Sequence, residues 1–315
     1  MFLSDAIWGF FFISQICIGF LGNSLLLMLY MYTFLTQSRL KKPIDLIFIH
    51  LTLVNVLTIM FKLIPDAASS FGVRHFLDDV GCKATLYTYR VTRGLSICTT
   101  SLLSAFQAIT ISPSTSKWAR LKSKISTCIL PSFLFFWIVS MLIYIYIIKV
   151  VDAKRNVTII GPVYSQPHCQ SKQMELHYSM TFLSIIVIRD LLFVVLMMGS
   201  SIYMVSLLYK HRQRAQHVHS PSLSSQPSPE IKATHNILLL VSCFVFFYWS
   251  NNFVTLYLFY RPEKNLRLER ITGILSSCYP TICPFVLMKN TKITLKFISF
   301  ISKMRTASSQ ETFSR

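Results

Sequence analysis

Seven long apolar runs dominate the hydropathy pattern of this chain, and short polar stretches separate them. The runs cover residues 7–32, 43–65, 84–111, 126–148, 177–208, 235–260 and 270–288. Roughly 20 residues of apolar helix cross a hydrocarbon core about 30 Å thick, and each run approaches or exceeds that length. The runs are apolar on all sides, whereas the strands of a membrane barrel alternate over about 10 residues. The pattern therefore predicts seven membrane-spanning helices.

Composition supports this prediction and leaves no room for a second domain. Of the 315 residues, 53% are hydrophobic and 14% are charged, whereas a soluble domain carries about 25% charged residues. We expect an all-α membrane protein. Residues 1–290 should form the seven-helix domain and residues 291–315 a short tail.

The formal net charge of +19 indicates orientation in the membrane, because its basic residues flank the apolar runs. The connections after the first, third and fifth runs, together with the tail, hold 17 basic and 2 acidic residues, and the opposite side holds 10 basic and 8 acidic residues. Cytoplasmic loops are enriched in Lys and Arg. We therefore expect a multi-pass plasma-membrane protein with its N-terminus outside, its tail in the cytoplasm, and no nucleic-acid partner.

The predicted outer side carries two features typical of the oxidising compartment. The only Asn-x-Ser/Thr sequon begins at Asn156, after the fourth run, which makes Asn156 a glycosylation candidate. Cys82 stands at the outer start of the third run, and Cys169 lies in the second outer loop. A disulfide between them would hold that loop over the bundle, and the alternative is two free thiols.

Charged residues inside the runs are the candidates for function, since such charges are costly and normally face the bundle interior or a water-filled cavity. They are Lys62, Arg90, Arg93, Arg189 and Asp190. Arg90 and Arg93 share a helix face. Arg189 and Asp190 point about 100° apart on a helix, so we expect that they do not simply pair with each other. Three interpretations remain open: interhelical ion pairs such as Asp190 with Arg90 or Arg93, contacts to a polar ligand, and, for Lys62, snorkelling to the interface.

The sequence contains no catalytic constellation. It has no Gly-rich phosphate loop, no His/Cys set with metal-ligand spacing and no nucleophile elbow. We therefore expect that the protein is not an enzyme and that it needs no metal or cofactor.

Several motifs resemble those of the rhodopsin-like G-protein-coupled receptors. Gly22-Asn23 is similar to the Gly-Asn of the first helix in that superfamily, and Cys283-Pro284 falls where its Asn-Pro-x-x-Tyr motif would stand. The run from His50 to Asn55 resembles Asn-Leu-Ala-Leu-Ala-Asp, with Asn55 in place of the usual Asp. The Cys82–Cys169 pair lies where related receptors form a bridge.

The departures from that superfamily resemble the vomeronasal type-1 pheromone receptors. The third run lacks Asp-Arg-Tyr, and the sixth lacks a proline. The stretches that match this family are residues 43–51, 101–114, 189–193 and 280–288. The resemblance implies a seven-transmembrane bundle of the rhodopsin-like type, a small pheromone-like ligand and a heterotrimeric G protein of the Gi/Go class. The alternatives are a bitter-taste type-2 receptor and, from another class, a multi-pass transporter.

Two sets of contacts are expected for a receptor of this kind. We expect a ligand cavity in the outer half of the bundle, between the second, third, fifth, sixth and seventh runs, beneath the disulfide-held loop. The residues expected to contact the ligand are Arg90, Arg93, Lys62, Arg189, Asp190 and Trp249. At the cytoplasmic ends, the residues expected near the G protein are Gln107, Ser112, Pro113, Lys117, Arg120, Arg212 and Arg214.

Overall fold

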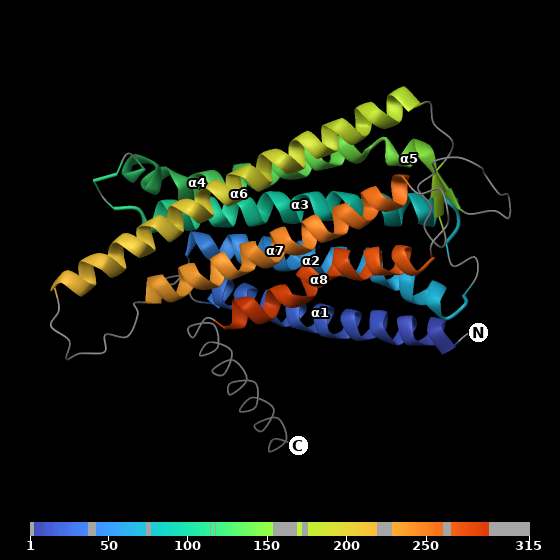
Figure 1. Cartoon of the computed structure of the whole chain (residues 1–315), viewed down its shortest axis with the longest axis horizontal. Coiled ribbons are helices and arrows are strands. Elements are labelled where there is room, and N and C mark those ends of the chain that lie inside the picture. The colour runs from blue at the N-terminus through green and yellow to red at the C-terminus, as the bar shows by residue number, and fades with distance from the viewer. Residues whose placement is uncertain are drawn as a thin grey trace, which may run out of the picture.

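Seven long helices form one bundle in the computed structural model of the chain (Figure 1). The structure describes residues 3–36, 42–73, 77–113, 115–116, 118–153, 169–171, 176–218, 229–260 and 266–289. The long helices are α1 (Leu3–Thr36), α2 (Pro43–Ser70), α3 (Asp79–Ile111), α4 (Ala119–Tyr144), α6 (Leu176–Val218), α7 (Pro229–Tyr260) and α8 (Leu266–Met288). Each contains a segment long and apolar enough to cross a membrane. The seven predicted spans are confirmed.

Local sequence signals account for the ends of α2 and α3. Pro43 opens α2, where a missing N–H is tolerated and the proline φ suits a helix. The Asp78 carboxylate caps α3 by accepting a hydrogen bond from the Gly81 N–H at 2.7 Å. At the far end Ser112 is extended, because the following Pro113 disfavours helical backbone in the residue before it.

Helix α3 lies in the middle of the bundle, and α4 and α6 lie on its periphery (Figure 1). In the apolar window of α3, 72% of residues are buried, whereas in α4 and α6 only 22% are. The outward face of α6 exposes large apolar side chains such as Leu183, Ile188, Leu192 and Ile202. An exposed apolar surface of this length is suited to lipid rather than water.

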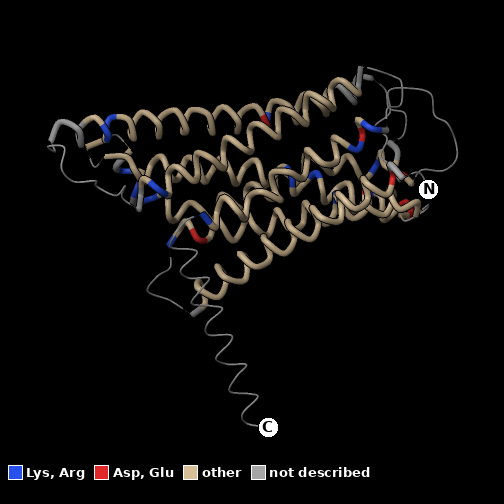
Figure 2. Tube along the Cα trace, turned by 60° about the horizontal axis from the view of Figure 1, so that its bottom comes forward, with Lys and Arg blue, Asp and Glu red and all other residues tan. Residues whose placement is uncertain are grey.

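Charged residues gather at the two ends of the bundle and leave its middle largely uncharged (Figure 2). Acidic and basic residues mix at the end that carries the start of α1, and the described residues at the opposite end are mostly basic (Figure 2). A few charges lie in the middle, as the sequence indicates. The arrangement is that of a protein whose central belt is buried in hydrocarbon.

A disulfide ties the start of the segment before α6 to α3. Cys82 and Cys169 are bonded, with their Cα atoms 5.7 Å apart, so the predicted disulfide is confirmed. A one-turn helix α5 (Ile147–Val150) leads into β1 (Val151–Ala153), which pairs antiparallel with β2 (Cys169–Ser171) at the end of the bundle where α1 starts (Figure 1). The Ala153 N–H donates to the Asp79 carboxylate at 2.7 Å. The hairpin is therefore fastened to α3 from both strands.

The Gly22-Asn23 pair has a structural explanation in the proline-containing helix α8. Pro284 has no N–H, so it cannot donate to the Pro280 carbonyl one turn earlier. The Asn23 side-chain N–H supplies that hydrogen bond at 2.8 Å. A Cβ at Gly22 would lie 2.9 Å from the Pro284 ring, so only glycine allows α1 to approach α8 this closely.

Candidate functional site

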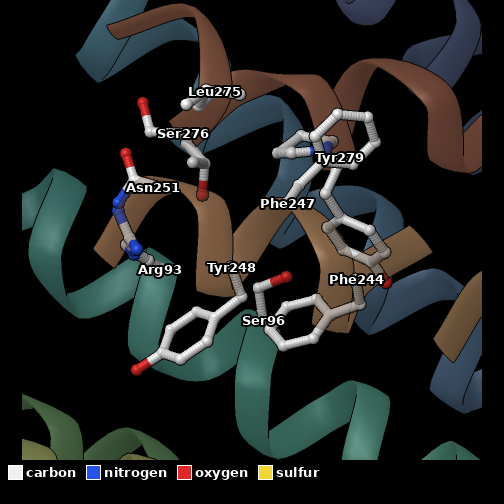
Figure 3. A pocket seen from close by; sticks show the side chains of 11 residues that line it. Arg93, Ser96, Phe244, Phe247, Tyr248, Asn251, Leu275, Ser276 and Tyr279 are labelled. Carbon is white, nitrogen blue, oxygen red and sulfur yellow. The ribbon is translucent and has the colours of Figure 1, made fainter. Parts of the chain in front are cut away.

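A small cavity lies between α2, α3, α7 and α8 (Figure 3). Its lining residues are Thr58, Arg93, Ser96, Phe244, Phe247, Tyr248, Asn251, Leu275, Ser276, Tyr279 and Pro280. Its volume is about 30 Å³, which is room for one or two water molecules and far below the roughly 300–1,000 Å³ of a drug-sized site. A larger ligand must therefore widen the cavity as it binds.

The cavity is mostly aromatic and apolar, with polar groups from all four helices. Phe244, Phe247 and Tyr279 supply much of the apolar wall, and Phe244 meets the ring of Tyr279 edge-to-face with centroids 4.7 Å apart. Arg93 is the only charged residue among the described residues that line the cavity. A predominantly apolar lining with a few oriented polar groups is the usual composition of a small-molecule site.

Arg93 is surrounded by neutral acceptors. Its Nη1 donates to the Tyr89 hydroxyl at 3.1 Å, and its Nη2 donates to the side-chain amide oxygen of Asn252 at 3.4 Å. The guanidinium also lies 5.5 Å from the centroid of the Tyr248 ring, within the range of a cation–π contact. Among the described residues, no carboxylate lies within ion-pair distance of Arg93.

Asn251 is the third polar neighbour of Arg93, and the two side chains face each other in Figure 3. The figure draws the amide nitrogen toward Arg93, which would set donor against donor and leave the amide oxygen facing the Thr272 carbonyl. With oxygen and nitrogen exchanged, the oxygen accepts from both terminal nitrogens of Arg93 at 2.8 and 2.9 Å, and the nitrogen donates to Thr272 at 3.0 Å. We assign this second orientation, because it turns three unfavourable contacts into three hydrogen bonds.

Lys62 and Arg189 differ from Arg93 in having a carboxylate on their own helix. The Lys62 ammonium lies 2.9 Å from Asp66, one turn along α2, and both side chains are 9% exposed. Lys62 therefore does not snorkel to the interface. Asp66 lies just beyond the second predicted run, so the sequence analysis did not consider it as a partner.

Arg189 and Asp190 also pair, and the prediction that they would not was wrong. The Arg189 Nε donates to Asp190 at 2.8 Å, and a terminal nitrogen donates to the Tyr144 hydroxyl of α4 at 2.9 Å. The long arginine side chain bends across the angle that separates the two Cβ atoms. Gly94 of α3 leaves room for this guanidinium, since a Cβ there would lie 2.9 Å from Arg189 Nη1.

The remaining ligand candidates lie away from the cavity. Arg90 is not among the lining residues and lies 5.9 Å from the Tyr89 ring centroid. Trp249 is 55% exposed on the outer face of α7, against our expectation, because its neighbours Phe247 and Tyr248 occupy the inward face. The fifth predicted run, which became α6, contributes no residue to the lining. Arg93 is therefore the one predicted ligand contact that lines the cavity.

At the opposite end of the bundle, two of the residues expected near a G protein are buried. The Gln107 amide donates to the Thr234 hydroxyl of α7 at 3.0 Å, and the Ser112 hydroxyl lies 2.9 Å from that of Tyr203 on α6. In this conformation Gln107 and Ser112 link neighbouring helices and are not accessible at the surface. Three are exposed: Pro113, Arg120 and Arg212. The side chains of Lys117 and Arg214, like the sequon at Asn156, lie outside the described residues.

The sequence analysis missed Asn251 and the hydroxyls of Thr58, Ser96 and Ser276. A usable signal existed for the first, because Asn251 and Asn252 are adjacent carboxamides inside an apolar run. Polar side chains in a membrane span normally face other helices. The three hydroxyl residues carried no comparable signal, since Ser and Thr satisfy themselves by bonding to a carbonyl of their own helix.

These features define the class of protein. Seven spans, a disulfide that ties the strand pair at one end to α3, and a small, mostly apolar cavity with a few polar groups are the architecture of a seven-helix receptor. The pattern of the vomeronasal organ pheromone receptor family matches residues 6–300. Human vomeronasal type-1 receptor 4 is 38% identical over 276 residues, 88% of this chain and 91% of that protein.

Other relatives show the same breadth of similarity. Olfactory receptor class A-like protein 1 of Danio rerio is 30% identical over 308 residues, which cover 96% of this chain and 95% of that protein. Human vomeronasal type-1 receptor 3 is 36% identical over 282 residues, 89% of each chain. The chain belongs to the vomeronasal type-1 family of G-protein-coupled chemosensory receptors, and it is a receptor rather than an enzyme.

Proposed function

We propose that this receptor detects a small pheromone-like molecule bearing an acceptor or anionic group, which Arg93 holds in the cavity between α2, α3, α7 and α8. Binding activates a heterotrimeric G protein of the Gi/Go class at the opposite end of the bundle. Membership of the family supports the receptor role. The position of Arg93 in the cavity lining is the observation that supports the ligand site.

Arg93 is difficult to explain as packing alone. A charge at the centre of a span costs about 2.5–3.5 kcal/mol even on the lenient insertion scale. Lys62 and Arg189 offset that cost with adjacent carboxylates. Arg93 has only neutral acceptors among the described residues and lines the cavity. Because no described carboxylate forms an ion pair with Arg93, its charge favours an electron-rich ligand group.

Substitution of Arg93 tests this site against a matched control. We expect Arg93→Gln to lower the potency of an activating ligand by at least about tenfold, since a charge-assisted hydrogen bond contributes roughly 1.5–3 kcal/mol. Arg90→Gln makes the same chemical change one turn away, at a residue that does not line the cavity. It should leave potency nearly unchanged. Both variants are compared at equal surface expression. Equal potency of wild type and Arg93→Gln contradicts the proposed site.

We infer that the basic end of the bundle faces the cytoplasm and binds the G protein. Arg120 at the start of α4 and Arg212 near the end of α6 are exposed there. Co-expression with individual Gα subunits tests the class, with a Gi/Go-type subunit expected to restore signalling. Arg120→Gln and Arg212→Gln together should weaken coupling without altering surface expression. If coupling is unchanged in this double variant, the basic residues only set the membrane orientation and contact lipid headgroups.

We infer further that the N-terminus is extracellular and that Asn156 is glycosylated. The charge asymmetry of the loops supports this orientation. An N-terminal tag should bind antibody on intact cells, and a C-terminal tag only after permeabilisation. Endoglycosidase should increase the gel mobility of the wild type and leave that of Asn156→Gln unchanged. Detection of the C-terminal tag on intact cells contradicts the orientation.

A further inference from the structure

We propose that Asn251 sets the charge selectivity of the cavity: its neutral amide oxygen holds the Arg93 guanidinium in place without cancelling its charge, so the site selects anions over neutral molecules of the same shape. The inference rests on the ligand site proposed above and goes beyond it by assigning selectivity to a residue of a different helix.

Asn251 and Arg93 meet in a close two-point contact. The amide oxygen accepts from both terminal nitrogens at 2.8 and 2.9 Å. These are the shortest contacts that Arg93 makes with described residues, and both involve the forked end of the guanidinium. One oxygen that accepts from both terminal nitrogens holds the forked end of the guanidinium against Asn251. Asn251 therefore orients the cation that lines the cavity.

Asn251 is itself held in place by its surroundings. The residue is 2% exposed, and its amide nitrogen donates to the Thr272 carbonyl of α8 at 3.0 Å. The amide is thereby held on both sides, between a cation on α3 and a carbonyl on α8. Such a group cannot rotate away from Arg93 without leaving a buried donor unpaired.

Arg93 differs in its partners from the neighbouring cations. Lys62 and Arg189 each pair with a carboxylate, at 2.9 and 2.8 Å. Position 251 holds the neutral counterpart of such a carboxylate, because Asn carries an NH2 group where Asp has its second carboxylate oxygen. Asp190 attracts Arg93 electrostatically without pairing with it, and it already accepts from Arg189 and, at 2.6 Å, from Tyr248. The charge of Arg93 remains available to a ligand.

A carboxylate at position 251 should therefore weaken the binding of anions relative to neutral molecules. Asn251→Asp places a negative charge where the amide oxygen now meets Arg93, and that charge repels an anionic ligand group at the same guanidinium. Two unit charges a few ångströms apart in a partly screened site change an affinity by at least about tenfold. A neutral ligand does not experience this repulsion.

The experiment uses the full-length receptor in detergent and a panel of ω-phenylalkanoic acids with their primary amides, which match in shape and differ in charge. Ligand-induced thermal stabilisation gives the affinity of each acid and amide. For wild type we expect the acids to bind more tightly than the amides. Asn251→Asp should lose at least about tenfold in acid affinity while the amides keep theirs. Asn251→Ser removes the two-point contact without adding charge, so it should weaken the acids yet keep them ahead of the amides.

Arg93→Gln separates this inference from the proposed site. If that variant loses acid binding and Asn251→Asp does not, Arg93 binds the ligand and the role given to Asn251 is wrong. If acids bind Arg93→Gln as well as wild type, or if no acid in the panel stabilises the wild type, the proposed ligand site itself fails. Should Asn251→Asp not fold, Asn252→Asp adds the same charge 3.4 Å from the same guanidinium. Asn252→Asp should reduce the ratio of acid affinity to amide affinity, and an unchanged ratio contradicts the inference.

Discussion

The buried pair of Arg189 and Asp190 gives the sharpest test of how charges are accommodated in this bundle. We consider Asp190→Asn, which keeps the size of the side chain and removes its charge. In the wild type the carboxylate accepts from Arg189 at 2.8 Å and from the Tyr248 hydroxyl at 2.6 Å. The two charged side chains are 7% and 10% exposed. The substitution therefore leaves Arg189 as a buried cation without its counterion.

The expected loss follows from that burial. Removal of one partner from a buried ion pair destabilises a protein by about 3–5 kcal/mol. The asparagine retains one acceptor oxygen for Arg189 or Tyr248, so we expect the lower end, about 3 kcal/mol. Replacement of both partners is far less costly, because no unpaired charge remains. Arg189→Met with Asp190→Asn should lose only about 1–1.5 kcal/mol, mainly the hydrogen bond to Tyr144.

Thermal unfolding of the detergent-solubilised receptor measures the difference. At the scaling of large domains, about 2–4 °C per kcal/mol, Asp190→Asn should lower Tm by about 6–12 °C. The double variant should recover more than half of that loss. All scans use one heating rate, since membrane proteins unfold irreversibly and Tm then depends on the rate. A double variant no more stable than Asp190→Asn would falsify the view that the unpaired charge causes the loss.

Two further predictions concern stability. Cys82→Ser with Cys169→Ser opens a bridge between residues 87 positions apart, so we expect a loss of ~2–5 kcal/mol and a Tm that no longer responds to reductant; an unchanged Tm argues against a stabilising disulfide. Trp137 donates to His50 Nε2 at 3.0 Å, and His50 Nδ1 lies 2.9 Å from the Thr99 hydroxyl. Because indole only donates, Nε2 must accept and Nδ1 carries the proton. Trp137→Phe leaves that acceptor unpaired and should cost ~1–3 kcal/mol, whereas Trp118→Phe, at an exposed indole, should change Tm little.

The sequence alone was sufficient for the features that depend on length and position along the chain. Seven apolar runs predict seven spans, because the hydrocarbon thickness sets the length of a spanning helix. The disulfide was also predictable, since Cys82 and Cys169 are the two cysteines outside the apolar runs on the expected oxidising side. The charges inside the runs indicated that Arg93 faces the interior.

Only the tertiary structure decided how each helix is rotated and which polar groups meet. The runs are apolar on every side, because one face packs against other helices and the other faces lipid, so their hydrophobic pattern does not distinguish the two. For this reason Trp249 was expected in the cavity and is 55% exposed, whereas Tyr248, one residue earlier, lines it. The same limit applies to Asn251, which meets Arg93 across 158 positions of sequence separation. Helix packing brings these side chains together, and the length and composition of each run do not encode that packing.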